Sequence, residues 1–283
     1  MQYEAPTTVD QAVALLKNSG NASKVLAGGT DLLVQLRSGM IEPELIVDIK
    51  KIPEVRSILK EDGKFRVGAV VTGAELGEHG DLKAAWPGVV EAAELIGSTQ
   101  IQGRASLGGN LCNASPAADA VPALVAAGAI CMIAGPNGRR ELPVGAICTG
   151  PGQTSLSPGE FVVSFLFPIP KPRSGDAYLR FIPRTEMDIA VVGVGIHITL
   201  DAENVCVDAR VAVGAVAPTV LLVEESAAAL VGTMVDDASI DKMIAAVRDS
   251  CDPIDDKRGT VVYRTQVAGV LAGRGCRIAL QRA

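Results

Sequence analysis

Apolar residues recur with two different periods in the first part of the chain, which predicts both strands and helices. Apolar runs typical of buried strands are at 23–27, 45–49, 55–59, 65–71 and 160–167. Apolar residues at helical spacing are at about 12–18, 72–79, 87–97 and 117–127. The turn residues at 61–63 and at 135–138 each separate two apolar runs, so both positions predict hairpins.

The pattern changes after residue 167. Pro168, Pro170 and Pro172 occupy alternate positions, which disfavours both a helix and a central strand, so we place a domain boundary near residue 172. Beyond it, strands are predicted at 176–183, 188–200 and 205–216, and helices at about 224–231, 237–250 and 259–281. Strands followed by helices favour an α+β unit, and the sequence predicts two domains, 1–172 and 173–283.

The first glycine-rich segment follows a predicted strand and opens a predicted helix. In Ala27-Gly28-Gly29-Thr30-Asp31 the paired glycines let backbone amides approach a ligand without a β-carbon in the way. Free amides at the start of a helix favour an anion, so the segment predicts a phosphate or diphosphate site. The alternative is an ordinary strand-to-helix turn with Thr30 as the N-cap.

A second glycine pair lies in residues 98–116, a stretch with almost no periodicity and many small polar residues. A long irregular stretch inside a compact region is uncommon unless it has a function. Its segment 106–110 (SLGGN) would clamp a diphosphate together with the first loop. Asn113, Ser115 and Asp119 follow; they suit a polyhydroxyl chain such as ribityl, or they cap the next helix.

The known nucleotide fingerprints do not fit these segments. The sequence has no G-x-x-x-x-G-K-[ST], and Gly193-Val194-Gly195 has Ile198 where a dinucleotide fingerprint needs its third glycine. A P-loop and a Rossmann domain are therefore poor interpretations.

Composition narrows the functional classes further. The chain has 283 residues with 26 Lys plus Arg and 32 Asp plus Glu, a net charge of −6, which disfavours nucleic-acid binding. The six cysteines lack C-x₂-C spacing, which argues against zinc and against an iron–sulfur cluster held by this chain alone. We see neither a secretory signal nor an apolar run long enough to span a membrane, so we expect a soluble, cytoplasmic protein with reduced thiols.

Residues suited to binding outnumber residues suited to proton transfer. The two histidines, His79 and His197, offer no plausible Ser/His/Asp set, and we expect His197 to be a hydrogen-bonded structural residue. Five of the nine aromatic residues fall between 161 and 181, where they line a flat ring or form a small local core. The excess of binding residues over proton-transfer residues indicates a cofactor that supplies the reaction chemistry itself.

Four stretches together carry a resemblance to a known family: 26–39 (LAGGTDLLVQLRSG), 105–119 (ASLGGNLCNASPAAD), 184–190 (RTEMDIA) and 263–274 (YRTQVAGVLAGR). With them the chain resembles the FAD-binding (medium) subunit of the molybdenum hydroxylase family, of the xanthine dehydrogenase and carbon monoxide dehydrogenase type. The resemblance implies an α+β fold. Its first part would be a vanillyl-alcohol-oxidase/PCMH-type FAD-binding domain with two α+β subdomains, about 1–52 and 53–172. A smaller C-terminal α+β domain with a three-stranded sheet and helices, of the CO-dehydrogenase-flavoprotein type, would follow.

The resemblance also implies a set of FAD-binding residues, with no catalytic side chain and no metal ligand. The first diphosphate loop would comprise Leu26, Ala27, Gly28, Gly29, Thr30, Asp31, Leu32 and Leu33, and the second Ser106, Gly108, Gly109 and Asn110. Toward the ribityl chain and the rings the matching positions are Asn113, Asp119, Ile96, Ile101, Val162, Tyr178 and Arg180. The segment 184–187 (RTEM) departs from the more charged form common in relatives, which leaves NAD, quinone, ferredoxin and oxygen open as acceptors.

The function implied by the resemblance is electron transfer inside a larger enzyme. FAD on this chain would take electrons from 2Fe-2S clusters of a partner and pass them to an external acceptor. A large subunit would carry molybdopterin, a small subunit two 2Fe-2S clusters, and the assembly would be a dimer of heterotrimers. Two alternatives are a self-contained flavin-dependent oxidoreductase of the same fold and a noncatalytic module that binds a nucleotide or a partner.

Overall fold

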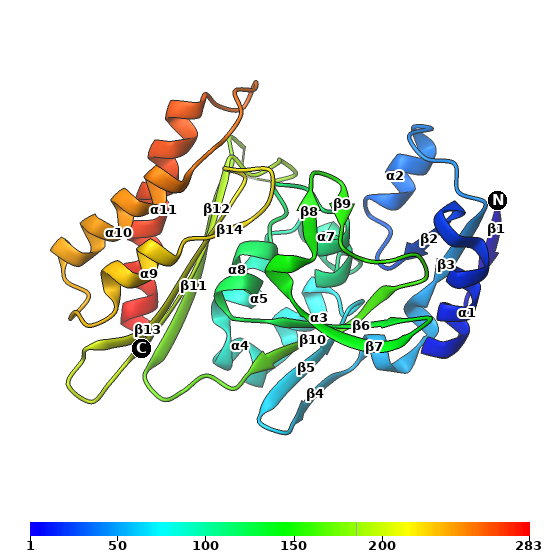
Figure 1. Cartoon of the computed structure of the whole chain (residues 1–283), viewed down its shortest axis with the longest axis horizontal. Coiled ribbons are helices and arrows are strands. Elements are labelled where there is room, and N and C mark those ends of the chain that lie inside the picture. Colours follow the sequence, from blue (N-terminus) through cyan, green and yellow to red (C-terminus); the bar gives the residue numbers. More distant parts are fainter. Residues whose placement is uncertain (185) are drawn as a thin grey trace.

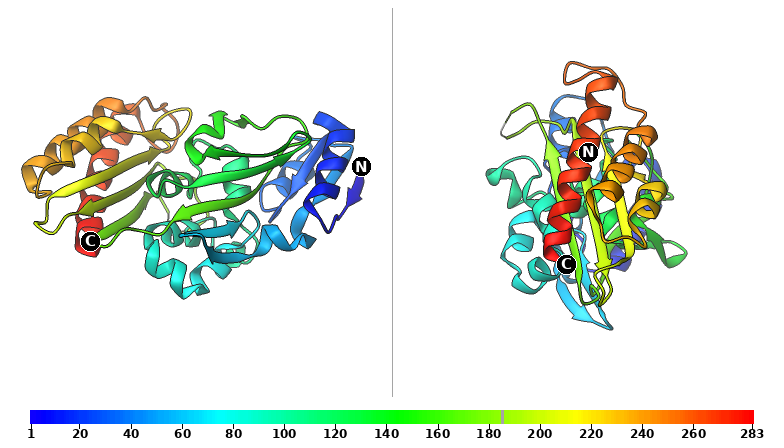
Figure 2. Two further views of the ribbon diagram at one scale, coloured as in Figure 1. Left: turned by 60° about the horizontal axis from the view of Figure 1, so that its bottom comes forward. Right: turned by 90° about the vertical axis from the view of Figure 1, so that its left-hand side faces the viewer.

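A computed structural model of the chain describes residues 1–184 and 186–283, so that Thr185 lies outside the described residues. Three sheet-containing units follow one another in a row (Figure 1). The three-stranded N-terminal sheet is at one end, a five-stranded sheet is in the middle and a four-stranded sheet is at the other end, as the turned views also show (Figure 2). The expected α+β organisation is confirmed.

The N-terminal unit is a small parallel sheet with one long helix. Its strands, in the order β1-β3-β2, are β1 (Gln2–Glu4), β2 (Ser23–Leu26) and β3 (Leu45–Asp48). Its helices are α1 (Val9–Ser19) and α2 (Leu32–Arg37), with the 3₁₀ turns η1 (Gly20–Ala22), η2 (Ile49–Lys51) and η3 (Pro53–Arg56). The Thr8 hydroxyl caps α1 by accepting from the Gln11 amide at 3.2 Å, and α1 packs its apolar side on β3.

The middle unit is an antiparallel sheet covered on one face by short helices. Its strands, in the order β4-β5-β10-β6-β7, are β4 (Ile58–Glu61), β5 (Lys64–Gly68), β10 (Phe161–Pro168), β6 (Ile130–Gly135) and β7 (Gly138–Pro143). The helices are α3 (Gly73–Glu78), α4 (Gly80–Ala85), α5 (Pro87–Glu94), α6 (Thr99–Gln102), α7 (Leu107–Cys112) and α8 (Val121–Ala126). A turn, η4 (Val144–Ala146), precedes the small hairpin β8 (Cys148–Gly150) and β9 (Gln153–Thr154). Both predicted hairpins are confirmed, and Phe65, Phe165 and Phe167 fill the core beneath the helices.

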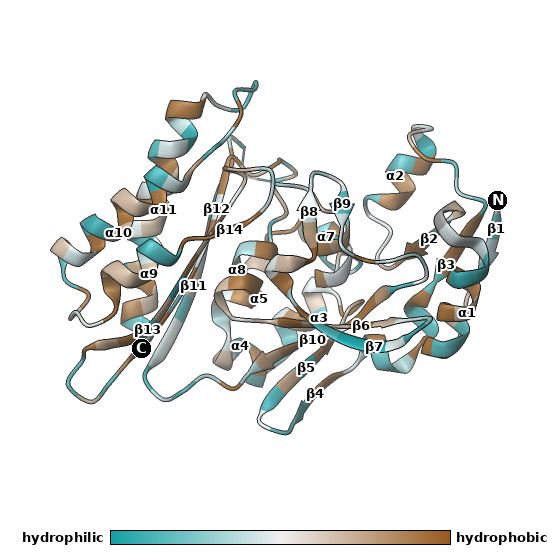
Figure 3. Cartoon of the chain, in the orientation of Figure 1, coloured by the Kyte–Doolittle hydropathy of each residue, from teal (hydrophilic) through white to brown (hydrophobic). Residues whose placement is uncertain are grey.

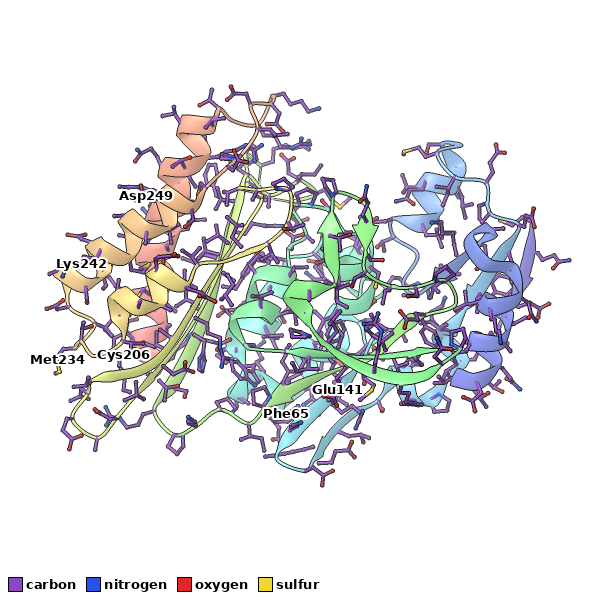
Figure 4. All side chains as sticks on the ribbon, in the orientation of Figure 1. Phe65, Glu141, Cys206, Met234, Lys242 and Asp249 are labelled. Carbon is purple, nitrogen blue, oxygen red and sulfur yellow. The ribbon has the colours of Figure 1, made fainter. Side chains whose placement is uncertain are left out.

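The C-terminal unit is an antiparallel sheet with helices on its outer face. Its strands are β11 (Ser174–Phe181), β12 (Val192–Leu200), β13 (Cys206–Gly214) and β14 (Leu221–Leu222), and its helices are α9 (Glu224–Leu230), α10 (Asp237–Ser250) and α11 (Val261–Arg282). The sheet has four strands, one more than expected, because the two-residue β14 pairs with β13. α10 turns Met243 into the core, while Lys242 and Asp249 project outward (Figure 4).

The inner face of this last sheet packs against the middle unit through α5 and α8, so every residue of β12 is buried, and most of them are apolar (Figure 3). On that face the rings of Trp86 and His197 are in contact, with centroids 5.1 Å apart and planes tilted by 41°. The expectation that His197 is a hydrogen-bonded imidazole is wrong: among the described residues neither ring nitrogen has a partner. Burial lowers the pKa of His197 to about 4, so the ring is neutral and packs as an apolar group.

Residues 98–116, expected to lack regular structure, contain α6 and α7. α7 forms although it includes Gly108 and Gly109, because Ser106 caps it and the Gly108 amide donates to the Ala69 carbonyl at 3.0 Å. Tertiary contacts therefore override the low helix propensity of the glycines. Within the described part of the chain, no helix combines the length and the apolar character needed to cross a bilayer.

Candidate functional site

A cavity of about 500 Å³ lies between the N-terminal sheet and α7. Its wall contains thirteen of the expected site residues: Ala27, Gly28, Gly29, Thr30, Asp31, Leu32, Ile96, Ser106, Gly108, Gly109, Asn110, Asn113 and Val162. The others, which are not part of this wall, are Leu26, Leu33, Ile101, Asp119, Tyr178 and Arg180. The two glycine segments, about 80 residues apart in the sequence, therefore meet at one cavity.

The first loop connects the end of β2 to the start of α2 and presents backbone amides. Among the described residues, the four amides from Gly29 to Leu32 have no hydrogen-bond acceptor. Gly29 has φ +82°, a conformation that favours glycine. The alternative of Thr30 as the N-cap is wrong, because Asp31 occupies that position and its side chain makes no capping bond. The amides are thus available to an anionic ligand.

The second loop leads into α7, and its two glycines have different surroundings. A β-carbon on Gly108 would lie 2.5 Å from the Ala69 carbonyl oxygen, so this glycine is needed for close packing. A β-carbon on Gly109 would meet only the Ser106 hydroxyl at 3.3 Å and the Ala27 β-carbon at 3.9 Å among the described atoms. Gly109 therefore borders open space opposite the first loop.

Gly28 is constrained by the second loop rather than by the cavity. A β-carbon there would collide with the backbone carbonyl of Arg104, just before the second loop. The loops also meet through polar side chains, since Gln35 Nε2 donates to Asn113 Oδ1 at 3.1 Å. The two glycine segments hold each other in place on either side of the cavity.

The polar residues after the second loop stabilise the loop itself. Asn110 Oδ1 accepts from the Ala120 amide at 3.0 Å, and Ser115 Oγ accepts from the Ala117 amide at 3.3 Å. Ser115 therefore closes a local turn. The interpretation that it caps the next helix is wrong, because α8 begins at Val121 with Ala120 as its N-cap and no side-chain capping bond. Asn113 remains at the cavity wall, with its amide oxygen engaged by Gln35.

Asp119 and Arg180 form an ion pair between the middle and C-terminal units. Arg180 Nη1 donates to Asp119 Oδ1 at 2.9 Å and to the Leu95 carbonyl at 2.7 Å. Their side chains are only 13% and 4% exposed. Burial raises the pKa of Asp119 although the Arg180 guanidinium opposes this shift. The hydroxyl of Tyr178 is buried without a partner among the described atoms, and burial raises its pKa.

The charges around the cavity are few and mostly neutralised. Burial raises the pKa of Asp31 on the first loop. Glu160 is held by Arg140 in a two-pronged ion pair with both N–O distances at 2.8 Å, and Arg140 lowers the pKa of Glu160. Lys24 adds one positive side chain at the wall. The site is thus polar mainly through its backbone.

These features suit a dinucleotide with a flat ring. Amides without an acceptor among the described residues line one side, and the space beside Gly109 lies on the other; together they accommodate a diphosphate. Ile96 and Val162 offer apolar contact to a ring, and 500 Å³ is within the usual range for small-molecule pockets. The site fits FAD by these tests. Among the described residues there is no group of three or more metal-type side chains.

Sequence reasoning missed part of the wall. The unexpected lining residues are Lys24, Val25, Gln35, Met40, Ile41, Ile49, Ala69, Ala105, Cys112, Gly152, Leu156, Glu160 and Phe161. Most are apolar residues in strands or connections, where nothing in the pattern distinguishes them from ordinary core. Gln35 had a weak signal, since it is the polar position of the short helix that follows the first loop.

Two family models match the chain. The model described as the FAD binding domain in molybdopterin dehydrogenase matches residues 1–170, and that of the CO dehydrogenase flavoprotein C-terminal domain matches residues 177–279. The chain is 32% identical over 281 residues to the carbon monoxide dehydrogenase medium chain of Hydrogenophaga pseudoflava, covering 99% of this chain and 97% of that one. It is 37% identical over 219 residues to the xanthine dehydrogenase FAD-binding subunit of Escherichia coli O157:H7, covering 77% and 74%.

Solved structures agree with these matches. A chain of reconstituted CO dehydrogenase from Oligotropha carboxidovorans superposes with a TM-score of 0.96 at 31% identity, covering 100% of this chain and 98% of that one. A chain of carbon monoxide dehydrogenase from Hydrogenophaga pseudoflava superposes with a TM-score of 0.95 at 32% identity, covering 100% and 98%. The fold expected from the resemblance, an FAD-binding domain followed by a C-terminal α+β domain, is confirmed.

Proposed function

The chain belongs to the family of FAD-binding subunits of molybdenum hydroxylases, and from this membership we propose that it carries electrons between a partner chain and an external acceptor. Electrons would come from 2Fe-2S clusters of the partner. The observation that carries the proposal is the pair of glycine loops at one cavity: the amides from Gly29 to Leu32 have no acceptor among the described residues, and Gly109 borders open space. FAD supplies the redox chemistry, and the chain supplies binding, orientation and electrostatics.

The binding roles follow from the local geometry. The amides of the first loop and the space beside Gly109 would hold the diphosphate. Ile96 and Val162 would contact the rings. Asp119, Tyr178 and Arg180 would influence the ring end indirectly, since Arg180 is fixed by Asp119 and by the carbonyl next to Ile96.

The larger assembly is part of the same proposal. A large molybdopterin-binding subunit and a small subunit with two 2Fe-2S clusters would complete the enzyme, as a dimer of heterotrimers in the cytoplasm. Support comes from relatives of nearly equal length that are named as medium chains or as a complex subunit, such as the 6-hydroxypseudooxynicotine dehydrogenase complex subunit alpha of Paenarthrobacter nicotinovorans, 30% identical over 281 residues. We also propose that the chain divides into domains near residue 172.

The first test is to purify the protein natively and identify what it carries. We expect absorption bands near roughly 370 and 450 nm, FAD released by acid, and copurifying chains that contain iron and molybdenum. A folded, colourless protein that takes up no added FAD would refute the proposal. A flavin that a small substrate bleaches in the isolated chain would instead support a self-contained oxidoreductase.

The second test separates electron delivery from electron release. The complex is reduced with dithionite, freed of excess reagent and mixed rapidly with NAD⁺, a quinone, ferredoxin or oxygen. A matched complex with Gly109→Val in this chain, purified without flavin, serves as the control. We expect reoxidation by the true acceptor to be fast only in the flavin-containing complex. Equal rates in both complexes would show that the electrons leave by another route.

A further inference from the structure

A half-buried lysine outside the cavity wall contacts the backbone of the first glycine loop. Lys50 lies in η2, directly after β3, and its side chain is 21% exposed. Its ammonium donates to Asp48 Oδ1 at 2.7 Å and to the Ala27 carbonyl at 3.0 Å. Ala27 immediately precedes the glycine pair. Lys50 is thus a charged side chain fixed to the backbone of the loop without being part of the cavity wall.

Asp48 holds Lys50 in this position. Asp48 pairs with Leu26 across the parallel strands β2 and β3, so it lies beside the end of the strand that feeds the loop. It also accepts from the Tyr3 hydroxyl at 2.5 Å and from the Lys50 amide at 3.0 Å. Burial opposes ionisation of this carboxyl, but its hydrogen bonds with Lys50 and Tyr3 keep the pKa of Asp48 below its ordinary value.

The bond to Ala27 has a direct geometric effect on the loop. In a trans peptide the carbonyl and the following N–H point in opposite directions. Because Lys50 fixes the Ala27 carbonyl toward its own ammonium, the N–H of Gly28 points in the opposite direction, away from Lys50. Among the described residues the Gly28 amide has no acceptor, and Gly28 belongs to the cavity wall.

The same bond has an electrostatic effect. A cation on a carbonyl polarises the peptide and makes its N–H a stronger donor, because hydrogen bonds in a chain reinforce one another at low dielectric. Asp48 offsets the charge of Lys50, so the effect is confined to the peptide between Ala27 and Gly28 that Lys50 contacts directly. The geometric and electrostatic effects both favour a bound diphosphate over an uncharged group.

We propose that Lys50 is a positioning residue for the diphosphate loop: it orients and polarises the peptide between Ala27 and Gly28, so that this chain binds the diphosphate of a dinucleotide more tightly. The role rests on the proposed function, since the diphosphate is that of FAD. Lys50 itself does not touch the ligand.

The test compares complexes that carry Lys50→Met, Lys50→Arg or Lys51→Met in this chain. Lys51→Met is the matched control, because Lys51 is the exposed neighbour on the same turn. Apo complexes are titrated with FAD. ADP and adenosine, which differ only in the diphosphate, are then measured as competitors of FAD. We expect Lys50→Met to weaken FAD and ADP roughly tenfold, the effect of losing a charge-assisted hydrogen bond. Adenosine should be unaffected.

Lys50→Arg should restore FAD binding to within about threefold of wild type, because the guanidinium keeps both the charge and a donor. Wild-type affinity in Lys50→Met, or equal weakening of ADP and adenosine, would overturn the role. If the Lys50→Met complex does not assemble, Asp48→Asn is used instead, because it removes the carboxylate that holds Lys50. Unchanged discrimination between ADP and adenosine in that variant would overturn the proposed role of Lys50. A wild-type complex that takes up no FAD would refute the proposed function itself, a different outcome.

Discussion

Neighbouring glycines of the second loop should respond in opposite ways to the same substitution. In Gly109→Ala the added β-carbon enters the space opposite the first loop, 3.9 Å from the Ala27 β-carbon. Filling an occupied binding space with a methyl group costs about 1–3 kcal/mol, so FAD should bind about 5- to 150-fold more weakly. Retention of FAD after gel filtration should fall accordingly.

The fold should tolerate Gly109→Ala. Its only close contact is the Ser106 hydroxyl at 3.3 Å, and replacing a helical glycine by alanine adds up to about 1 kcal/mol of helix stability. The two effects oppose each other, so the Tm of the flavin-free protein should stay within about 4 °C of wild type.

Gly108→Ala is the matched control with the reverse pattern. Its β-carbon would lie 2.5 Å from the Ala69 carbonyl oxygen and 2.8 Å from the Ala69 β-carbon, inside the core. Overpacking of this kind costs about 1–3 kcal/mol and should lower the Tm by about 2–12 °C. Calorimetry of flavin-free protein and flavin titrations separate the two variants.

Full FAD affinity in Gly109→Ala would refute the placement of the diphosphate beside this residue. A loss of FAD affinity that only parallels a loss of folded protein would refute this placement as well. The comparison depends on no property of the partner chains, because both variants are assembled and assayed in the same complex.

Three further predictions concern buried titratable groups. Asp119→Asn leaves the Arg180 guanidinium buried without its carboxylate partner and should lower the free energy of unfolding by about 3–5 kcal/mol. The double variant with Arg180→Met should recover part of this stability. Denaturant unfolding measures both effects, and an unchanged stability in Asp119→Asn would contradict the role of the ion pair. Burial raises the pKa of Asp176 to about 7, so stability should fall as pH rises from about 4 to 7. Asp176→Asn should therefore raise the Tm more at pH 8 than at pH 5. Equal shifts in Tm at the two pH values would argue against a raised pKa of Asp176. The lowered pKa of His197 has the opposite sign, since stability is lost as pH falls from about 6.5 to 4. His197→Phe should flatten this acid limb in a Tm-against-pH profile while keeping an aromatic contact with Trp86.

Much of the fold is predictable from sequence where local signals agree with the tertiary structure. The pattern predicts a helix over 237–250, and α10 has these bounds because apolar residues at helical spacing follow the Asp236 cap, which accepts from the Ser239 amide. The pattern fails over 98–116, where α7 contains two glycines. Its formation depends on the contact with Ala69, which no local pattern reveals.

The candidate site, too, is predictable only where a local sequence signal marks it. Glycine pairs beside hydroxyl residues mark both loops in the sequence. The pairs combine two needs, since Gly28 and Gly108 allow close packing while Gly109 leaves space for a ligand. Phe161 and Leu156 at the wall have no such mark, because any apolar residue of suitable size could stand there. The ion pair between Asp119 and Arg180 was also out of reach, since 61 residues separate its partners.

The strand order of the middle sheet has a consequence for biosynthesis. β10 is its central strand, pairing with β5 on one side and with β6 on the other, yet it is the last of the five to leave the ribosome. β5 ends at Gly68 and β10 begins at Phe161. At about 5–20 residues per second, the β4–β5 hairpin waits roughly 5–20 s for β10 with an unpaired edge. The β6–β7 hairpin ends at Pro143 and waits roughly 1–4 s.

Phe161 and Val162 of β10 also complete the cavity wall. The nascent chain therefore cannot use its cofactor as a folding template during that interval, and FAD can add stability only after the sheet has closed.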